Sequence, residues 1–266
     1  ILWKIKNRRE GIIMILTEKK VLVTRPHKIV YRDGDRIVKV FSKGHGKANV
    51  FNEALCHTRV EESGLDIPKV LEVSTFEDQW AIAIEYVEGK TLAQLMEENP
   101  DKVEQYINQF VDLQIKMSSC KVNRLTFQKD KFSRKINSLK DTIDATARYE
   151  LCTRLNSMPA HTKLCHGDFN PTNVIVKEDG SMAIVDWSHA TQGNASGDAA
   201  ITYQEFALKN PDLADYYLDV FCKKTDTAKQ YVQKWLPITA AARLTQIITE
   251  EEKQFLMRWI DVIDFQ

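Results

Sequence analysis

Two polar side chains flank a predicted β-hairpin. Residues 173–186 alternate apolar and polar side chains on both sides of Asp179-Gly180, a pair that favours a two-residue turn. Counting outward from that turn places Asn173 opposite Asp186. Directly opposed residues share one face of a hairpin, so we expect an amide oxygen and a carboxylate to meet at its open end. Such oxygen ligands suit Mg²⁺; the alternative is that both residues only cap strand ends.

A further carboxylate precedes the hairpin. Asp168 lies five residues before Asn173, in a stretch where Gly167 and Pro171 predict irregular backbone. We therefore expect its side chain to face the same point as the metal pair. A carboxylate there can accept the proton of an alcohol and orient it for in-line attack on phosphorus, which is the base role in phosphoryl transfer.

These side chains need a scaffold, and the chain divides into two compositional halves. β-branched runs up to about residue 86 predict a five-stranded antiparallel sheet with one helix, near residues 48–63. The second half has helical periodicity. The predicted strands cover residues 21–24, 29–31, 36–41, 70–73 and 80–84, and the later helices cover about 91–98, 103–118, 132–155, 198–209, 213–224, 227–236 and 250–263, around a β-rich island at 173–187.

The predicted fold class is therefore α+β, with two lobes that share a cleft. We expect an N-terminal nucleotide-binding lobe over residues 14–88 and a C-terminal helical lobe over residues 89–266, which carries the catalytic loop and the acceptor site. Met14 opens a stretch typical of a domain start, so residues 1–13 are expected to be a disordered extension.

Composition excludes several classes of partner. Lys plus Arg and Asp plus Glu both number 37, so the chain has no bulk positive charge for binding nucleic acid. No apolar run approaches the roughly 18 residues of a membrane-spanning helix. The five cysteines are widely spaced and form no CxxC pair, which indicates reduced thiols. We therefore expect a cytoplasmic protein with neither a nucleic-acid nor a membrane partner, and the oligomeric state stays open.

The residues around Asp168 lie in two motifs with a family resemblance. His166-Gly167-Asp168-Phe169-Asn170-Pro171-Thr172-Asn173, followed by Ile184-Val185-Asp186-Trp187, closely resembles the HGDxxxxN and DW motifs of the aminoglycoside phosphotransferase and choline kinase group. These are small-molecule kinases with a protein-kinase-like fold. The resemblance implies that Asp168 is the catalytic base and that Asn173 and Asp186 hold Mg²⁺.

The same resemblance implies two supporting residues. His166 would be a structural residue of the catalytic loop. Asp198 resembles the family's Asp that opens the next helix and steadies that loop, and a helix N-cap position is compatible with this role.

A lysine in an apolar strand offers charge for a phosphate donor. Lys39 shares a predicted face with Ile37 and Phe41, where it needs a partner or a ligand unless it extends to the surface. The resemblance implies that Lys39 contacts the α and β phosphates of ATP or GTP and pairs with Glu53, 14 residues later. It also implies that main-chain groups of Glu85 and Val87 hold the adenine at a hinge between the lobes.

The segment expected to cover the phosphates, near residues 25–28, contains no glycine, which excludes a GxGxxG-like cradle. A hairpin count that pairs Tyr31 with Arg36 places Lys28 opposite Lys39. We therefore expect Lys28 to supply positive charge where glycine amides are missing.

Sequence patterns do not distinguish between the possible classes of acceptor molecule. Acidic and aromatic residues of the helical half could bind a cation, although such residues are more typical of solvated faces and of the core. Ser188 follows Asp186-Trp187 where many antibiotic kinases have an acidic residue, so an aminoglycoside-like compound, a sugar and an amino alcohol all stay open. The candidates are Asp212, Asp215, Asp219, Glu250, Glu251, Glu252, Trp187, Tyr203, Trp235 and Trp259.

We interpret the chain as a phosphotransferase that moves the γ-phosphoryl group of ATP or GTP to a hydroxyl of a small molecule. One alternative is a non-catalytic nucleotide-binding or regulatory protein of the same fold, which the presence of Lys39, Asp168, Asn173 and Asp186 disfavours. Another is a protein kinase, which the lack of an Ala-Pro-Glu-like segment after Asp186 disfavours.

Overall fold

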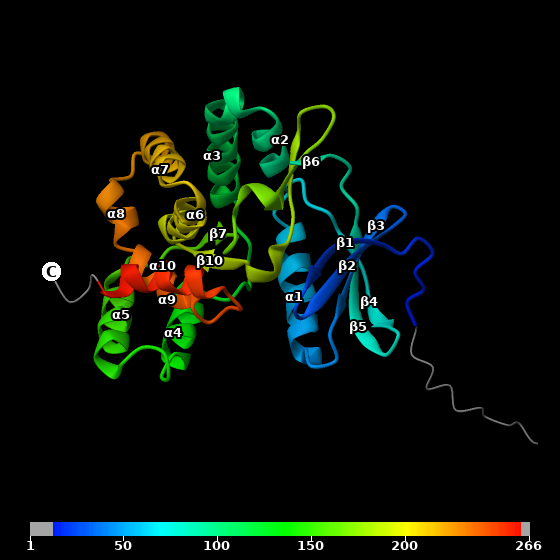
Figure 1. The fold of residues 1–266 in the computed structure, drawn as a ribbon, viewed down its shortest axis with the longest axis horizontal. Helices are drawn as coiled ribbons and strands as arrows, with labels where there is room; N and C mark the ends of the chain where they lie inside the picture. The colour runs from blue at the N-terminus through cyan, green and yellow to red at the C-terminus, as the bar shows by residue number, and fades with distance from the viewer. Residues whose placement is uncertain (1–12, 262–266) are drawn as a thin grey trace, which may run out of the picture.

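The β-branched runs of the first half form a five-stranded antiparallel sheet in the computed structural model, which describes residues 13–261 (Figure 1). The strand order is β1-β2-β3-β5-β4, so the predicted sheet is confirmed. Its strands are β1 (Lys20–Arg25), β2 (Lys28–Asp33), β3 (Arg36–Phe41), β4 (Val70–Phe76) and β5 (Gln79–Glu85).

Both faces of β3 are buried, for different reasons. Val38 and Val40 pack with Met14 on one face, whereas Phe41 packs on the other face against α1 (Lys47–Glu61). Because side chains alternate along a strand, Lys39 shares the face of Phe41 and points toward α1. The sheet thereby directs Lys39 at α1, the only helix described between residues 13 and 88.

The β2–β3 turn differs from the predicted register. Asp33 pairs with Arg36 and Lys28 pairs with Phe41, so Lys28 does not lie opposite Lys39 as predicted. The reason is that Gly34, at φ +63°, takes the turn position that favours glycine. The error is two residues, which leaves Lys28 on the same face as Lys39.

A buried carboxylate ties the segment before β1 to this hairpin. Asp33 accepts hydrogen bonds from the main-chain nitrogens of Thr17 and Glu18 at 2.7 and 2.6 Å, and from the guanidinium of Arg36. Arg36 also donates to the carbonyl oxygen of Ile15. Asp33 therefore joins three stretches of chain through one side chain.

Helices and short strands make up the second lobe (Figure 1). The predicted helical half is confirmed, as is the overall α+β class. Its elements are β6 (Lys90–Thr91), α2 (Leu92–Glu98), α3 (Val103–Ser119), α4 (Gln128–Ser138), α5 (Ala145–Ser157), β7 (Lys163–Cys165), β8 (Val174–Val176), β9 (Met182–Ile184), β10 (Thr191–Gly193), α6 (Ala195–Lys209), α7 (Pro211–Thr225), α8 (Lys229–Gln233), α9 (Leu236–Arg243) and α10 (Glu250–Asp261), with 3-10 turns at Pro100–Lys102, Pro171–Asn173 (η2) and Trp187–His189 (η3).

Two predicted helices are each divided in the structure. The 132–155 segment breaks before Asp144, whose carboxylate caps α5 by accepting from the main-chain nitrogen of Ala147. The 227–236 segment forms α8, a turn at residues 234–235 and only the first residue of α9, in whose first turn Pro237 lies. Strands β7 and β10 were not predicted.

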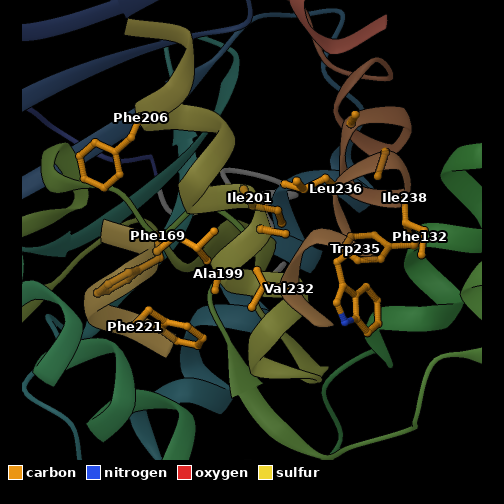
Figure 2. Packing of buried hydrophobic residues seen from close by; sticks show 14 of the residues in the cluster. Phe132, Phe169, Ala199, Ile201, Phe206, Phe221, Val232, Trp235, Leu236 and Ile238 are labelled. Atoms are coloured by element: carbon orange, nitrogen blue, oxygen red, sulfur yellow. The ribbon is translucent and has the colours of Figure 1, made fainter. Parts of the chain in front are cut away.

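The C-terminal lobe has one continuous core, and the catalytic loop is anchored in it. Figure 2 shows Phe132, Ile201, Phe221 and Ile238 meeting there from α4, α6, α7 and α9. Phe169 is fully buried, and its ring lies 4.3 Å from that of Phe110 on α3, measured between centroids. The residue after Asp168 is therefore held by aromatic packing.

Most of the predicted extension over residues 1–13 lies outside the described residues, as do the last two residues of the predicted 250–263 helix. Ile13 forms an isolated bridge with Thr75. Among the helices within residues 13–261, none combines the length and apolarity needed to cross a membrane.

Candidate active site

The β8–β9 hairpin brings Asn173 and Asp186 to the cleft with a register other than the predicted one. Lys177 and Ser181 face each other across a three-residue loop, in which Gly180 has φ +80°. Val174 therefore pairs with Ile184, and Asn173 accepts the main-chain hydrogen bond of Val185. The prediction that Asn173 lies directly opposite Asp186 was wrong, because Asp179-Gly180 also fits a loop that is one residue longer.

Asp186 reaches the other lobe through an unusual backbone conformation. It follows β9 with φ 61° and ψ 59°, in the left-handed region. Its Oδ1 accepts a hydrogen bond of 2.7 Å from Nζ of Lys39, 147 residues away in the sequence. A left-handed non-glycine residue of this kind is uncommon, and such strain clusters at functional sites.

Four charges meet between the lobes, and we call them the charged quartet: Lys28, Lys39, Glu53 and Asp186. Nζ of Lys39 lies 2.8 Å from Oε1 of Glu53, the partner that the family resemblance implied. Nζ of Lys28 lies 3.9 Å from Glu53 and 3.7 Å from Asp186. The structure thus places Lys28 beside Lys39 despite the different register.

Charges within the quartet shift the pKa values of two of its members, Lys39 and Asp186. Burial acts to lower the pKa of Lys39, but the carboxylates of Asp186 and Glu53 outweigh it and raise that pKa. Burial acts to raise the pKa of Asp186, and the ammonium groups of Lys39 and Lys28 overcome it and hold that pKa well below its usual range. Both pKa shifts favour the charged form of the side chain.

Two amides orient the Asp168 carboxylate. Nδ2 of Asn173 donates to Oδ2 of Asp168 at 3.0 Å, and Nδ2 of Asn170 donates to Oδ1 at 3.1 Å. Burial and the nearby charge of Asp186 raise the pKa of Asp168 to about 6, while the two amides act in the opposite direction. The role of Asn170 was not predicted, although its place before a proline is typical of a turn residue.

Asp198 holds the catalytic loop through main-chain groups. Its carboxylate accepts from the nitrogen of His166 at 3.0 Å and from that of Gly167 at 2.7 Å. It lies in the first turn of α6 and does not cap it, because Asn194 is the N-cap. The N-cap interpretation of Asp198 was therefore wrong, whereas its contact with the loop is present.

His166 and Gly167 fix the loop against η3. His166 is fully buried, with Nε2 3.0 Å from the carbonyl oxygen of Val185 and its ring 4.6 Å from that of Trp187. Gly167 has φ +78°, and a Cβ there would lie 2.6 Å from the carbonyl oxygen of His189. Only glycine fits this backbone at this distance, so the loop and η3 pack directly on each other.

The predicted hinge borders a cavity. The main-chain nitrogen of Glu85 donates to the carbonyl oxygen of Lys69, and that of Tyr86 donates to the carbonyl oxygen of Asp35. Glu85 and Val87 line a cavity of about 480 Å³, which the tip of the β8–β9 hairpin closes on its other side.

Most acidic acceptor candidates are engaged elsewhere. Asp215 accepts from the hydroxyl of Tyr203, and Asp219 pairs with Lys229. Glu252 pairs at 3.0 Å with Arg243, a residue that sequence reasoning missed and whose charge acts to lower the pKa of Asp168. Of the aromatic candidates, Trp187 and Trp235 belong to the core, and the rings of Tyr203 and Trp259 lie 6.0 Å apart.

Across residues 13–261, no group of three or more His, Cys, Asp or Glu side chains is placed to hold a metal ion. The oxygen ligands available in the cleft are a carboxylate pair and an amide: Asp168, Asp186 and Asn173. This donor set fits Mg²⁺ if phosphate oxygens and water complete the coordination.

A family model described as the phosphotransferase enzyme family matches residues 27–232. No curated protein matches the chain. Among solved structures, the aminoglycoside phosphotransferase APH(4)-Ia superposes with TM-score 0.68 at 16% identity, covering 93% of this chain and 92% of that chain. Choline kinase LicA from Streptococcus pneumoniae superposes with TM-score 0.66 at 16% identity, covering 95% of both chains. A choline/ethanolamine kinase family protein from Mesorhizobium loti gives 0.64 at 14% identity, covering 93% of this chain and 88% of that one. At these identities the shared feature is the fold, which agrees with the resemblance.

Proposed function

The chain belongs to the phosphotransferase enzyme family, and from its cleft we propose that it transfers the γ-phosphoryl group of ATP or GTP to a hydroxyl group of a small molecule. One observation carries this proposal. The charged quartet joins the two lobes within a few ångströms, and its Asp186 is close enough to raise the pKa of Asp168.

The donor phosphates would bind at the quartet. Lys39 is held in place by Glu53, so its ammonium is positioned in advance for phosphate oxygens. Lys28 adds a second ammonium on the same side. Main-chain groups of Glu85 and Val87 would hold the adenine. Support for ATP comes from APH(4)-Ia, which has been solved in a ternary complex with AMP-PNP and hygromycin B.

Asn173 and Asp186 are the residues that would hold Mg²⁺. The hydrogen bond from Nδ2 of Asn173 to Asp168 leaves the amide oxygen as its metal-binding atom. When bound, the ion neutralises charge that develops between the β and γ phosphates. Asp186 would then exchange its contact with Lys39 for one with the cation.

Asp168 would accept the proton of the acceptor hydroxyl. A pKa of about 6 leaves the carboxylate mostly ionised at neutral pH and still basic enough to act. Asn170 and Asn173 fix its direction, and Asp198 with His166 positions the loop that carries it. The acceptor class we assign is a small hydroxylated molecule.

A direct acceptor screen tests this function. Purified protein is incubated with Mg²⁺, radiolabelled ATP or GTP and a panel of alcohols, sugars and amino alcohols, and labelled products are counted. We expect at least one labelled small molecule, and labelling at least about 100-fold slower with Asp168→Asn. Nucleotide binding without any transfer would instead favour a non-catalytic protein, and labelling of peptides alone would favour a protein kinase.

A further inference from the structure

Three basic side chains gather beside the catalytic loop, and we call them the basic cluster: Lys131, Lys135 and Arg243. Lys131 and Lys135 lie one turn apart on α4, and Arg243 ends α9. The start of α4 is fixed because Gln128 exchanges hydrogen bonds with the main chain of Asn194 at the start of α6. The position of α4 relative to the helix that carries Asp198 is therefore well defined.

Each member of the cluster contacts the surroundings of Asp168. Nζ of Lys131 donates at 2.8 Å to the carbonyl oxygen of His189, the same atom against which Gly167 packs. Nζ of Lys135 donates at 3.2 Å to the carbonyl oxygen of Ala242, next to Arg243. Arg243 pairs with Glu252 on α10 and with Glu205 on α6. Lys131 thus lies beside the loop that carries Asp168, and Arg243 lies near enough to Asp168 to act on its pKa.

The two lysines have no ion-pair partner in the described part of the chain. Over residues 13–261, neither has a carboxylate within 4.0 Å. Burial lowers the pKa of Lys131 and of Lys135 to about 8, and in each case a neighbouring cation acts in the same direction. His189 does not add to the charge, because burial together with Lys131 and Lys135 lowers its pKa to about 3.

Arg243 is only partly satisfied. Its carboxylate partners Glu205 and Glu252 both bind Nη2, and Arg243 is 5% exposed. Its Nη1 is buried without a hydrogen-bond partner in the described part of the chain. A buried donor without a partner is costly, which suggests that the site is completed by something outside the chain.

A purely structural role accounts for part of this pattern. Lysines often donate to the last carbonyl groups of a helix, and Ala242 lies at the end of α9. An ammonium has three donors, however, and the contacts above use one on each lysine. Lys131 and Lys135 are both partly exposed, so their remaining donors can reach a ligand.

We propose that the basic cluster binds an anionic group of the acceptor, so that the substrate is a hydroxylated small molecule bearing a carboxylate or a phosphate ester. This rests on the proposed function, because it assigns the substrate class of the same site. An anion would offer acceptors to the free donors of the cluster, and charge-assisted hydrogen bonds to such groups are strong. A polycationic acceptor would instead meet like charge.

Binding of a simple anion tests the proposal once the nucleotide site is blocked. The full chain is first titrated with Mg·AMP-PNP and then, when saturated, with inorganic phosphate, at constant ionic strength in a calorimeter. We expect Lys135→Gln to weaken phosphate binding by about tenfold or more, because one charged hydrogen bond is lost. Lys135→Arg should retain most of the affinity. The matched control is Lys140→Gln, which removes an exposed charge just beyond α4 and should leave the affinity unchanged.

A second arm compares matched acceptors. Glucose, glucosamine, gluconate and glucose 6-phosphate are each tested as acceptors with Mg·ATP. Each compound is also tested for inhibition of phosphoryl transfer to the others. We expect gluconate or glucose 6-phosphate to bind the saturated protein more tightly than the neutral and cationic sugars, and the two anions distinguish carboxylate from phosphate ester. Equal phosphate affinity in the wild type and Lys135→Gln, or no phosphate binding at all, would overturn the inference alone. Failure of Mg·AMP-PNP to bind would remove the proposed function itself and the inference with it.

Discussion

Asp168 receives hydrogen bonds from the amides of Asn170 and Asn173 on its own loop. These amides fix the direction of the carboxylate, whereas the carboxylate itself is the proton acceptor. We predict that Asp168→Asn lowers kcat by about 10²–10⁴-fold, because the proton acceptor is lost. The affinity for Mg·ATP should stay within about twofold, since Asp168 does not belong to the quartet that would hold the phosphates. Steady-state kinetics and nucleotide titration measure both values. A variant that keeps normal kcat would refute the assignment of the base.

Lys28 contacts both carboxylates of the quartet, in a segment without glycine. We predict that Lys28→Gln weakens Mg·ATP binding by about five- to tenfold, because an ammonium near the phosphates is lost. Lys20→Gln, which removes an exposed charge from β1, serves as the control. Unchanged nucleotide affinity in Lys28→Gln would show that this lysine only balances Glu53 and Asp186.

At the residue scale, the sequence predicted which side chains lie in the cleft better than it predicted how they are arranged there. Lys39 and Glu53 could be paired from a strand, a helix and a family motif, and they meet at 2.8 Å. The positions of Asp186 and Asn173 depend on a longer loop and a left-handed backbone, neither of which the alternation of residues encodes. Arg243 could not be anticipated, because only the packing of α9 brings it near Asp168.

Single elements are held to one another by buried polar contacts, of which Asp33 in the β2–β3 hairpin is one. Its hydrogen bonds with Thr17, Glu18 and Arg36 lower its pKa to about 2, although burial acts to raise it. Because the folded pKa lies below the unfolded one, Asp33 contributes stability above about pH 4, and that contribution is lost as the pH falls toward 2.

We therefore predict that Asp33→Asn lowers the free energy of unfolding by about 2 kcal/mol at pH 6. The difference from the wild type should shrink as the pH falls from 4 to 2, and urea unfolding at a series of pH values measures it. Asp35→Asn, in the same turn but exposed, should have little effect. A difference that is independent of pH would contradict this account.

The elements themselves were largely predictable, and the exceptions have local causes. Long runs of one periodicity, such as those of α3 and β3, appear as strands and helices close to the predicted bounds. The helix break before Asp144 was missed because the apolar period continues through it, and α9 was missed because the predicted 227–236 helix ends at the residue where α9 begins. β7 and β10 are each three residues long and have too little alternation to be recognised.

The whole molecule depends on contacts that cross from one lobe to the other. Asp186 joins Lys39 over 147 residues, and Lys177 at the β8–β9 tip joins Asp66 beyond α1. We predict that Mg²⁺ with ATP at about 100 times Kd raises stability by about 2.7 kcal/mol, which corresponds to about 5–11 °C in Tm.

Differential scanning calorimetry with Mg²⁺ alone, ATP alone and both together measures this shift. Asp186→Asn should remove most of the gain that Mg²⁺ adds to ATP, whereas Asp179→Asn, at the exposed hairpin tip, should keep it. An equal response of both variants to Mg²⁺ would exclude Asp186 as a ligand of the ion.

The charged quartet contains two ammonium groups and two carboxylates, within a chain whose formal net charge is zero. An approaching triphosphate therefore experiences little attraction at long range, and recognition begins only at contact distance. Association rate constants should accordingly show little electrostatic steering. They should also vary little when sodium chloride is added, unlike those of proteins that draw polyanions in through a basic surface.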